Sequence, residues 1–179
     1  MTGFRPRRNS AASLPGTEKL SLQEFIPYKL AVAANRLSQS IGSLFEQKYG
    51  IQIPEWRILM ALHSCGPLAP NEVVEHTSMD KARVSRAQRR LVELELVTPS
   101  ADPRDGRRLV LFLTRKGADM CEAIIPEARQ TEAWFLSVLS EPEREMLDTV
   151  LSRLLERSRE ARQPDEDLTA AIDSEAGRQ

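Results

Sequence analysis

The sequence contains few of the residues from which metal and catalytic centres are built. Among its 179 residues are two cysteines, Cys65 and Cys121, and two histidines, His63 and His76. The cysteines form no CxxC pair and the histidines no metal-ligand spacing, so we expect neither a structural metal site nor a disulfide framework. A glycine-rich phosphate loop and a Ser/His/acid order are also missing. We therefore predict that the protein is not an enzyme and holds no cofactor.

Long hydrophobic runs are missing as well. No segment approaches the roughly 20 apolar residues that a membrane span needs. The basic N-terminus MTGFRPRRNS lacks the apolar region of a secretory signal. The hydrophobic content of 41% and the charged content of 28% are typical of one globular domain with tails. Together with the scarcity of cysteine, these features indicate a cytoplasmic protein.

Charge is unevenly distributed along the chain, although the formal net charge is only −1. Residues 80–116 carry ten basic and five acidic residues, whereas residues 140–179 carry eleven acids and six arginines. This asymmetry suggests that a polyanion binds the middle of the chain. A solvated charged surface explains either segment by itself, so the interpretation depends on the architecture around the basic segment.

The spacing of apolar residues predicts a mainly α-helical fold. We expect disordered tails over residues 1–19 and 163–179, and one domain over residues 20–162. Helices are predicted over residues 21–48, from Pro54, from Pro70 or Asn71, from Asp80 to Leu94, and over residues 114–162, where Ser140 starts a second helix. LVTPS and RLVLFLT lie between the last two regions and predict two short strands. Short helices followed by a β-hairpin wing form a winged helix-turn-helix, here over about residues 54–113.

The predicted helix from Asp80 to Leu94 has one apolar and one basic side. Its apolar residues are spaced three and four apart and should be buried: Val84, Ala87, Leu91 and Leu94. The opposite side, here called the outer face, consists of Lys81, Arg83, Ser85, Arg86 and Arg89. A helix fits the DNA major groove, where arginine donates two hydrogen bonds to guanine, while arginines on the flanks pair with phosphates. A salt-bridged surface helix is the alternative, and Arg90 can pair with Glu93 or Glu95 instead of DNA.

The predicted hairpin carries a second basic cluster in SADPRDGRRLVLFLT. Arg104, Arg107 and Arg108 at its tip can reach the minor groove or the DNA backbone. Asp102 and Asp105 can orient these arginines by bidentate pairing, because a carboxylate fits the fork of a guanidinium. An ordinary charged hairpin is the alternative interpretation.

These segments resemble a known family. MDKARVSRAQRRLVELELV followed by DPRDGRRLVLFLTRKG resembles the recognition helix and wing of MarR-type transcriptional regulators, and IPEWRILMAL resembles their second helix. The similarity covers roughly residues 20–157. One departure is Glu95, a position at which the family commonly has glycine.

The resemblance implies a homodimer formed by the first and last helices, here around Leu22 to Tyr28 and over residues 114–162. The last helix has an apolar stripe, and the helix before it carries Trp134 and Phe135. These residues agree with a homodimer, because isologous packing would bury them. Two recognition helices would then bind a pseudo-palindromic operator in double-stranded DNA. Repression is expected from the family's usual mode of action.

The resemblance also implies release from DNA by a small aromatic or phenolic acid, or by its CoA thioester. LSLQEFIPYKLAVAANRLSQSI and IPEWRIL resemble members that control the breakdown of aromatic acids such as hydroxycinnamates. The expected ligand-binding residues between the dimer helices and the DNA-binding lobe are Tyr28, Asn35, Arg36, Trp56, Arg57 and His63. Arg36 or Arg57 could pair with a carboxylate, and Trp56 could form an aromatic wall. Core packing of Trp56 and a salt bridge of Arg57 are the alternatives.

Two other functions stay open at this point. Some relatives sense oxidants through a cysteine, but only His63 is near enough in sequence to lower the pKa of Cys65. A winged helix can also bind protein or RNA without binding DNA. Strong salt dependence and preference for a palindromic duplex would distinguish DNA binding from such a module.

Overall fold

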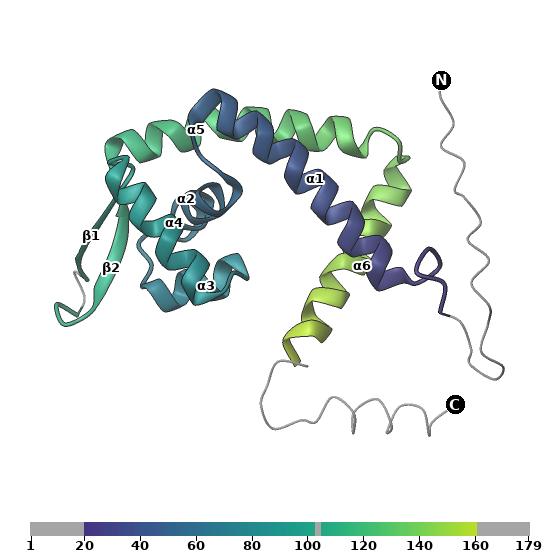
Figure 1. The fold of residues 1–179 in the computed structure, drawn as a ribbon, viewed down its shortest axis with the longest axis horizontal. Coiled ribbons are helices and arrows are strands. Elements are labelled where there is room, and N and C mark those ends of the chain that lie inside the picture. Colours follow the sequence, from purple (N-terminus) through teal and green to yellow (C-terminus); the bar gives the residue numbers. More distant parts are fainter. Residues whose placement is uncertain (1–19, 103–104, 161–179) are drawn as a thin grey trace, which may run out of the picture. The chain divides into compact units, whose positions relative to one another are not determined.

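The computed structural model describes residues 20–102 and 105–160 (Figure 1). The chain divides into two compact units, Met1–Phe112 and Leu113–Gln179. The elements are α1 (Ile26–Tyr49), α2 (Ile53–Cys65), α3 (Pro70–Thr77), α4 (Lys81–Glu93), β1 (Val97–Ala101), β2 (Leu109–Leu113), α5 (Arg115–Leu136) and α6 (Glu141–Glu160). This order confirms the predicted helical fold with a two-stranded wing. The expected tails and Arg104 lie outside the described residues.

The first helix begins later than the sequence predicts. Instead of starting at residue 21, α1 starts at Ile26, and the preceding residues form a turn in which the Phe25 amide donates to the Ser21 carbonyl at 3.1 Å. Pro27 explains the difference, because proline lacks an amide hydrogen and is best tolerated in the first turn of a helix. Gly50 ends α1 as predicted, with the positive φ of 67° that glycine adopts without steric cost.

The core of the first unit lies where α2 packs against α3 and α4. The largest fully buried side chains there include Phe45, Ile58, Leu59, Leu91, Leu96 and Leu111. Burying each of them contributes about 1.5–3 kcal/mol to the free energy of unfolding. Pro54 and Pro70 each lie in the first turn of their helix, as predicted. The core therefore fixes the position of α4.

The end of α4 has the hydrogen bonds of a Schellman motif. The Leu96 amide donates to the Leu91 carbonyl at 3.0 Å, and the Glu95 amide donates to the Val92 carbonyl at 2.9 Å. The residue between helix and strand in this motif takes a left-handed conformation, and Glu95 has a φ of 58°. Leu94 is only half-buried, so the prediction that it belongs to the buried stripe is wrong; Leu96 takes that place.

The wing is tied to the helices by a contact that the sequence did not predict. Leu68, in the connection between α2 and α3, forms an isolated antiparallel bridge with Leu111 of β2. The Leu111 amide donates to the Leu68 carbonyl at 2.8 Å, and the Leu68 amide donates back at 3.3 Å. Both side chains are buried. The base of the wing is therefore held to the helix-turn-helix, while residues 105–109 of the wing are exposed.

The second unit contains α5 and α6. Thr114 caps α5 as predicted, with its hydroxyl oxygen accepting from the Gly117 amide at 3.0 Å. At the start of α6, the Glu143 carboxylate accepts from both the amide and the hydroxyl of Ser140, at 2.8 and 2.6 Å. These bonds lower the pKa of Glu143. None of the described helices is long and apolar enough to cross a membrane.

Candidate nucleic-acid interface and ligand cavity

The outer face of α4 lies opposite its buried stripe, as predicted. Val84, Ala87 and Leu91 are at most 3% exposed and fix which side of the helix faces the core. At about 100° per residue, Ser85, Arg86 and Arg89 lie on the far side, whereas Lys81 and Arg83 lie on the flanks. All five side chains are exposed. The far side can enter a groove, and the flanks lie where phosphates would run.

The arginines of the outer face are available to a partner. Among the described residues, no ion pair engages Arg83, Arg86 or Arg89. Arg90 differs, because its guanidinium lies 3.5 Å from the Glu93 carboxylate. This pairing confirms the alternative interpretation of Arg90 and separates it from the outer face. Asp80 caps α4 by accepting from the Arg83 amide at 2.8 Å.

Arg108 at the wing pairs with a carboxylate far away in the sequence, which the local pattern of residues does not indicate. Its Nη2 lies 3.1 Å from Glu72 Oε1 in the first turn of α3. The other oxygen of Glu72 accepts from the Ala69 amide at 2.6 Å. The pKa of Glu72 is lowered mainly by the hydrogen bond from the Ala69 amide, and to a smaller extent by the hydrogen bond from the Arg108 guanidinium. Both side chains stay about half exposed, so Arg108 links the wing to α3 and is still accessible to DNA.

Asp105 shapes the wing through the backbone. Its carboxylate accepts from the Arg107 amide at 3.1 Å, and its carbonyl accepts from the Arg108 amide at 2.9 Å. These bonds differ from the expected pairing with a guanidinium, and they leave the Arg107 side chain exposed. The Asp102 amide donates to the Arg108 carbonyl at 2.8 Å and closes the hairpin on the other side. Both aspartates thus lie where they can order the turn.

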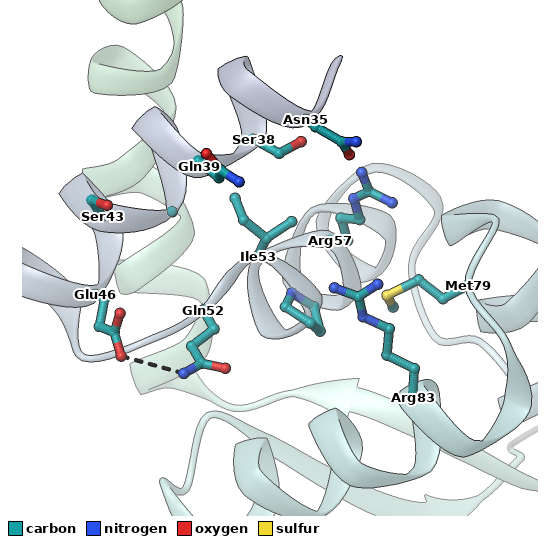
Figure 2. A pocket seen from close by; sticks show the side chains of 12 residues that line it. Asn35, Ser38, Gln39, Ser43, Glu46, Gln52, Ile53, Arg57, Met79 and Arg83 are labelled. Atoms are coloured by element: carbon teal, nitrogen blue, oxygen red, sulfur yellow. Dashed lines mark hydrogen bonds between the residues drawn. The ribbon is translucent and has the colours of Figure 1, made fainter. Parts of the chain in front are cut away.

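A cavity of about 450 Å³ opens between α1, α2 and the start of α4 (Figure 2). Its lining residues are Asn35, Ser38, Gln39, Gly42, Ser43, Glu46, Gln52, Ile53, Pro54, Arg57, Met79 and Arg83. Asn35 and Arg57 belong to the expected ligand-binding set. The α1 residues recur at intervals of three and four, which places them on one helix face. This polar row was the signal in the sequence that could have located the cavity.

Two guanidinium groups dominate the chemistry of the cavity. Figure 2 shows the side chains of Arg57 and Arg83 pointing into the space beneath α1, with Met79 beside Arg83. Arg57 Nη1 donates to the Thr77 carbonyl across a long 3.5 Å. The Glu46 carboxylate in the lining accepts from the Gln52 side-chain amide at 3.2 Å. An anion that also carries hydrogen-bonding groups suits this lining, because arginine pairs with carboxylates through two bonds.

The other four expected ligand-binding residues do not line this cavity. Tyr28 and Arg36 are exposed on α1, and His63 is exposed in the last turn of α2. Trp56 packs on Phe45 with ring centroids 5.4 Å apart, and its buried Nε1 has no hydrogen-bond partner among the described residues. Trp56 therefore follows the alternative interpretation of core packing. No aromatic side chain is among the described residues that line the cavity.

The two cysteines have different surroundings. Cys65 is exposed, and its Sγ lies 3.8 Å from Nδ1 of His76, a neighbour that the sequence did not indicate. Cys121 is buried, and this burial raises the pKa of its thiol to about 11. At neutral pH the Cys121 thiol is therefore protonated and shielded, which makes it a poor candidate for an oxidant sensor.

Comparison with known proteins points to one family. A sequence model of the MarR family matches residues 49–108, which contain α2, α3, α4 and β1 and end just before β2. The HTH-type transcriptional repressor NicR of Pseudomonas putida is 33% identical over 103 residues. The matched region is 58% of this chain and 65% of the length of NicR.

Two solved structures extend the similarity beyond the winged helix-turn-helix. A probable transcriptional regulator from Pseudomonas aeruginosa is 32% identical, with a TM-score of 0.65 over 75% of this chain and 99% of that one. A MarR/EmrR family regulator from Acinetobacter sp. ADP1 is 25% identical, with a TM-score of 0.73 over 79% of this chain and 99% of its own. These relatives are regulators of transcription and not enzymes. With its winged helix-turn-helix and the long helices on either side of it, the chain belongs to the MarR family of transcriptional regulators.

Proposed function

We propose that the protein is a homodimeric repressor that binds a pseudo-palindromic operator and leaves it when a small organic acid binds. The observation that carries the DNA-binding part is the outer face of α4, where exposed cations lie opposite the buried stripe of Val84, Ala87 and Leu91. Its site of action is the chromosome, and hence the cytoplasm. The name of NicR as a repressor supports repression over activation.

The position of each basic residue on α4 determines whether we assign it to bases or to phosphates. Arg86 and Arg89, with Ser85, bind base edges in the major groove, because they lie farthest from the core. Lys81 and Arg83 bind phosphates from the flanks. In the wing, the exposed tip with Arg107, and Arg104 outside the described residues, reaches the minor groove or the backbone. Arg108 contacts a phosphate while its guanidinium also pairs with Glu72.

Exposed apolar side chains support a dimer. The described side chains of α6 include none that is buried, and Met146, Val150, Leu151, Leu154 and Leu155 are exposed on it. In the same unit, Trp134 is 72% and Val138 is 84% exposed. The start of the first unit exposes Leu20, Leu22 and Ile26. So much exposed apolar surface is costly in water, and a second copy of the chain would cover it.

The cavity supports a free acid as the effector. Arg57 and Arg83 can hold a carboxylate, and Ile53, Pro54 and Met79 supply apolar surface for a ring. The volume of about 450 Å³ suits a small-molecule site. A CoA thioester is a poorer fit, because its acyl group has lost the carboxylate, and its phosphates lie many bonds away from the ring that the cavity would hold. We therefore favour a small aromatic or phenolic acid.

A gel-shift assay with the duplex that flanks the protein's own gene tests this function. We expect a dimeric complex whose affinity falls steeply with salt, because each phosphate contact releases counterions. Adding a panel of aromatic acids should release the DNA, whereas their CoA thioesters should not. Binding that is weak at low salt, or equal for all duplexes, would contradict the proposed function.

A further inference from the structure

Arg83 belongs to two sites at once. It is part of the outer face of α4, and its side chain also lines the cavity beside Arg57. The Asp80 carboxylate holds the Arg83 backbone amide at 2.8 Å, so the first turn of α4 is fixed. Its exposed side chain makes no ion pair with any described residue. The long arginine side chain is therefore the part of this region that can serve either site without movement of α4.

We propose that DNA phosphate and the carboxylate of the effector compete for Arg83 within each protomer. This inference rests on the proposed function and deepens it. Without effector, Arg83 extends from the flank of α4 to a phosphate. When a carboxylate occupies the cavity, Arg83 turns toward it and joins Arg57 in holding it. The protomer then loses one phosphate contact.

The two arginines have unequal roles in this arrangement. Arg57 is half-buried on α2, next to the Thr77 carbonyl, and it lines the cavity. It supplies the permanent positive charge that attracts the carboxylate. Arg83 supplies the second guanidinium, and bidentate pairing makes the bound state strong enough to compete with a phosphate. Because coupling between two binding sites is reciprocal, DNA must weaken effector binding by the same factor.

The remaining lining narrows the chemical class of the effector. Asn35, Ser38 and Gln39 present amide and hydroxyl groups from α1, and no aromatic wall faces them among the described residues. A compact monocarboxylate that bears a hydroxyl group on its ring would use the guanidinium pair and this polar row together. 4-Hydroxybenzoate and 4-hydroxycinnamate are suitable probes. 4-Hydroxybenzamide is the matched uncharged control.

The test compares the full-length wild type with Arg83→Ala and with Arg90→Ala. Arg90 is a matched control, because it is exposed on the same helix, pairs with Glu93 and does not line the cavity. Fluorescence anisotropy measures the affinity for the operator duplex as a function of salt, with and without each probe. For a dimer, Arg83→Ala should reduce the slope of log affinity against log salt by about 2, because two phosphate contacts are lost. Arg90→Ala should keep the wild-type slope.

Saturating acid should reduce the slope of the wild type to that of Arg83→Ala, and should change the slope of the variant little. 4-Hydroxybenzamide should change neither. Release of Arg83→Ala by saturating acid as large as that of the wild type would overturn the competition, while leaving the proposed function intact. A wild type that binds no duplex, or that no acid releases, would instead contradict the proposed function itself. Circular dichroism of each variant confirms that it is folded.

Discussion

At the scale of single residues, Glu95 adopts the left-handed backbone conformation that ends α4, and this conformation is sterically strained for a residue with a side chain. The Schellman motif at the end of α4 requires a left-handed residue, and Glu95 adopts it with a φ of 58°. A side chain in this conformation places Cβ close to the following carbonyl, which glycine avoids. The departure from the family's common glycine therefore leaves the helix end unchanged and introduces local strain.

Replacing Glu95 should reveal this strain. Both Glu95→Gly and Glu95→Ala remove the side-chain interactions, but only glycine also removes the steric cost. We expect the glycine variant to have a free energy of unfolding about 0.5–1 kcal/mol above that of the alanine variant. Urea denaturation followed by circular dichroism measures the difference. Equal stability of the two variants would show that the backbone at this position is not strained.

The pairing of Glu72 gives a second prediction, which concerns pH. Because its pKa is lowered in the folded protein, the interaction is present above the ordinary value of 4.5 and is lost as the pH falls through the lowered pKa. Arg108→Ala should raise the pKa of Glu72 only part of the way, since the Ala69 amide is the larger cause. NMR titration of the Glu72 carboxyl carbon measures this. Arg107→Ala, the control, should leave it unchanged, and an unchanged value in Arg108→Ala would refute the pairing.

At the scale of elements, the sequence predicted what depends on local pattern. Apolar spacing placed α4 and its buried stripe, and cap residues such as Thr114 placed helix ends within one or two positions. Contacts between distant segments were not predictable in this way. Arg108 and Glu72 are 36 residues apart, and nothing local signals the bridge between Leu68 and Leu111. Arg57 was expected at the ligand site. Arg83 was not, because its place in the cavity lining depends on how α4 packs beside α2.

At the scale of the whole molecule, the proposed recognition of an operator depends on a dimer that joins two copies of α4. One recognition helix contacts a single half-site, and two helices at a fixed separation can bind both halves of an operator. The exposed apolar residues of α6 are the surface that we expect to set this separation. The protein's selectivity for DNA would then depend on residues far from the DNA itself.

Charge placed on that surface should separate the subunits. Leu151→Glu combined with Leu155→Glu would bury four carboxylates in a dimer without partners, which is strongly unfavourable. We expect a monomer of half the wild-type mass by light scattering, and an affinity for the operator at least about tenfold lower, since the second half-site no longer contributes. Glu156→Lys, which reverses one charge, is the control, because Glu156 lies roughly 140° from Leu151 and 80° from Met146 around the helix. A double variant that stays dimeric would place the interface elsewhere.

The most direct test of the central claim, that the outer face of α4 binds the operator, is the affinity of Arg86→Ala for operator and for unrelated duplex. Arg86 lies far from the core and forms no ion pair among the described residues. Loss of a base contact should weaken operator binding by about 1–3 kcal/mol per half-site and change binding to unrelated duplex much less. An operator affinity equal to that of the wild type would contradict the claim.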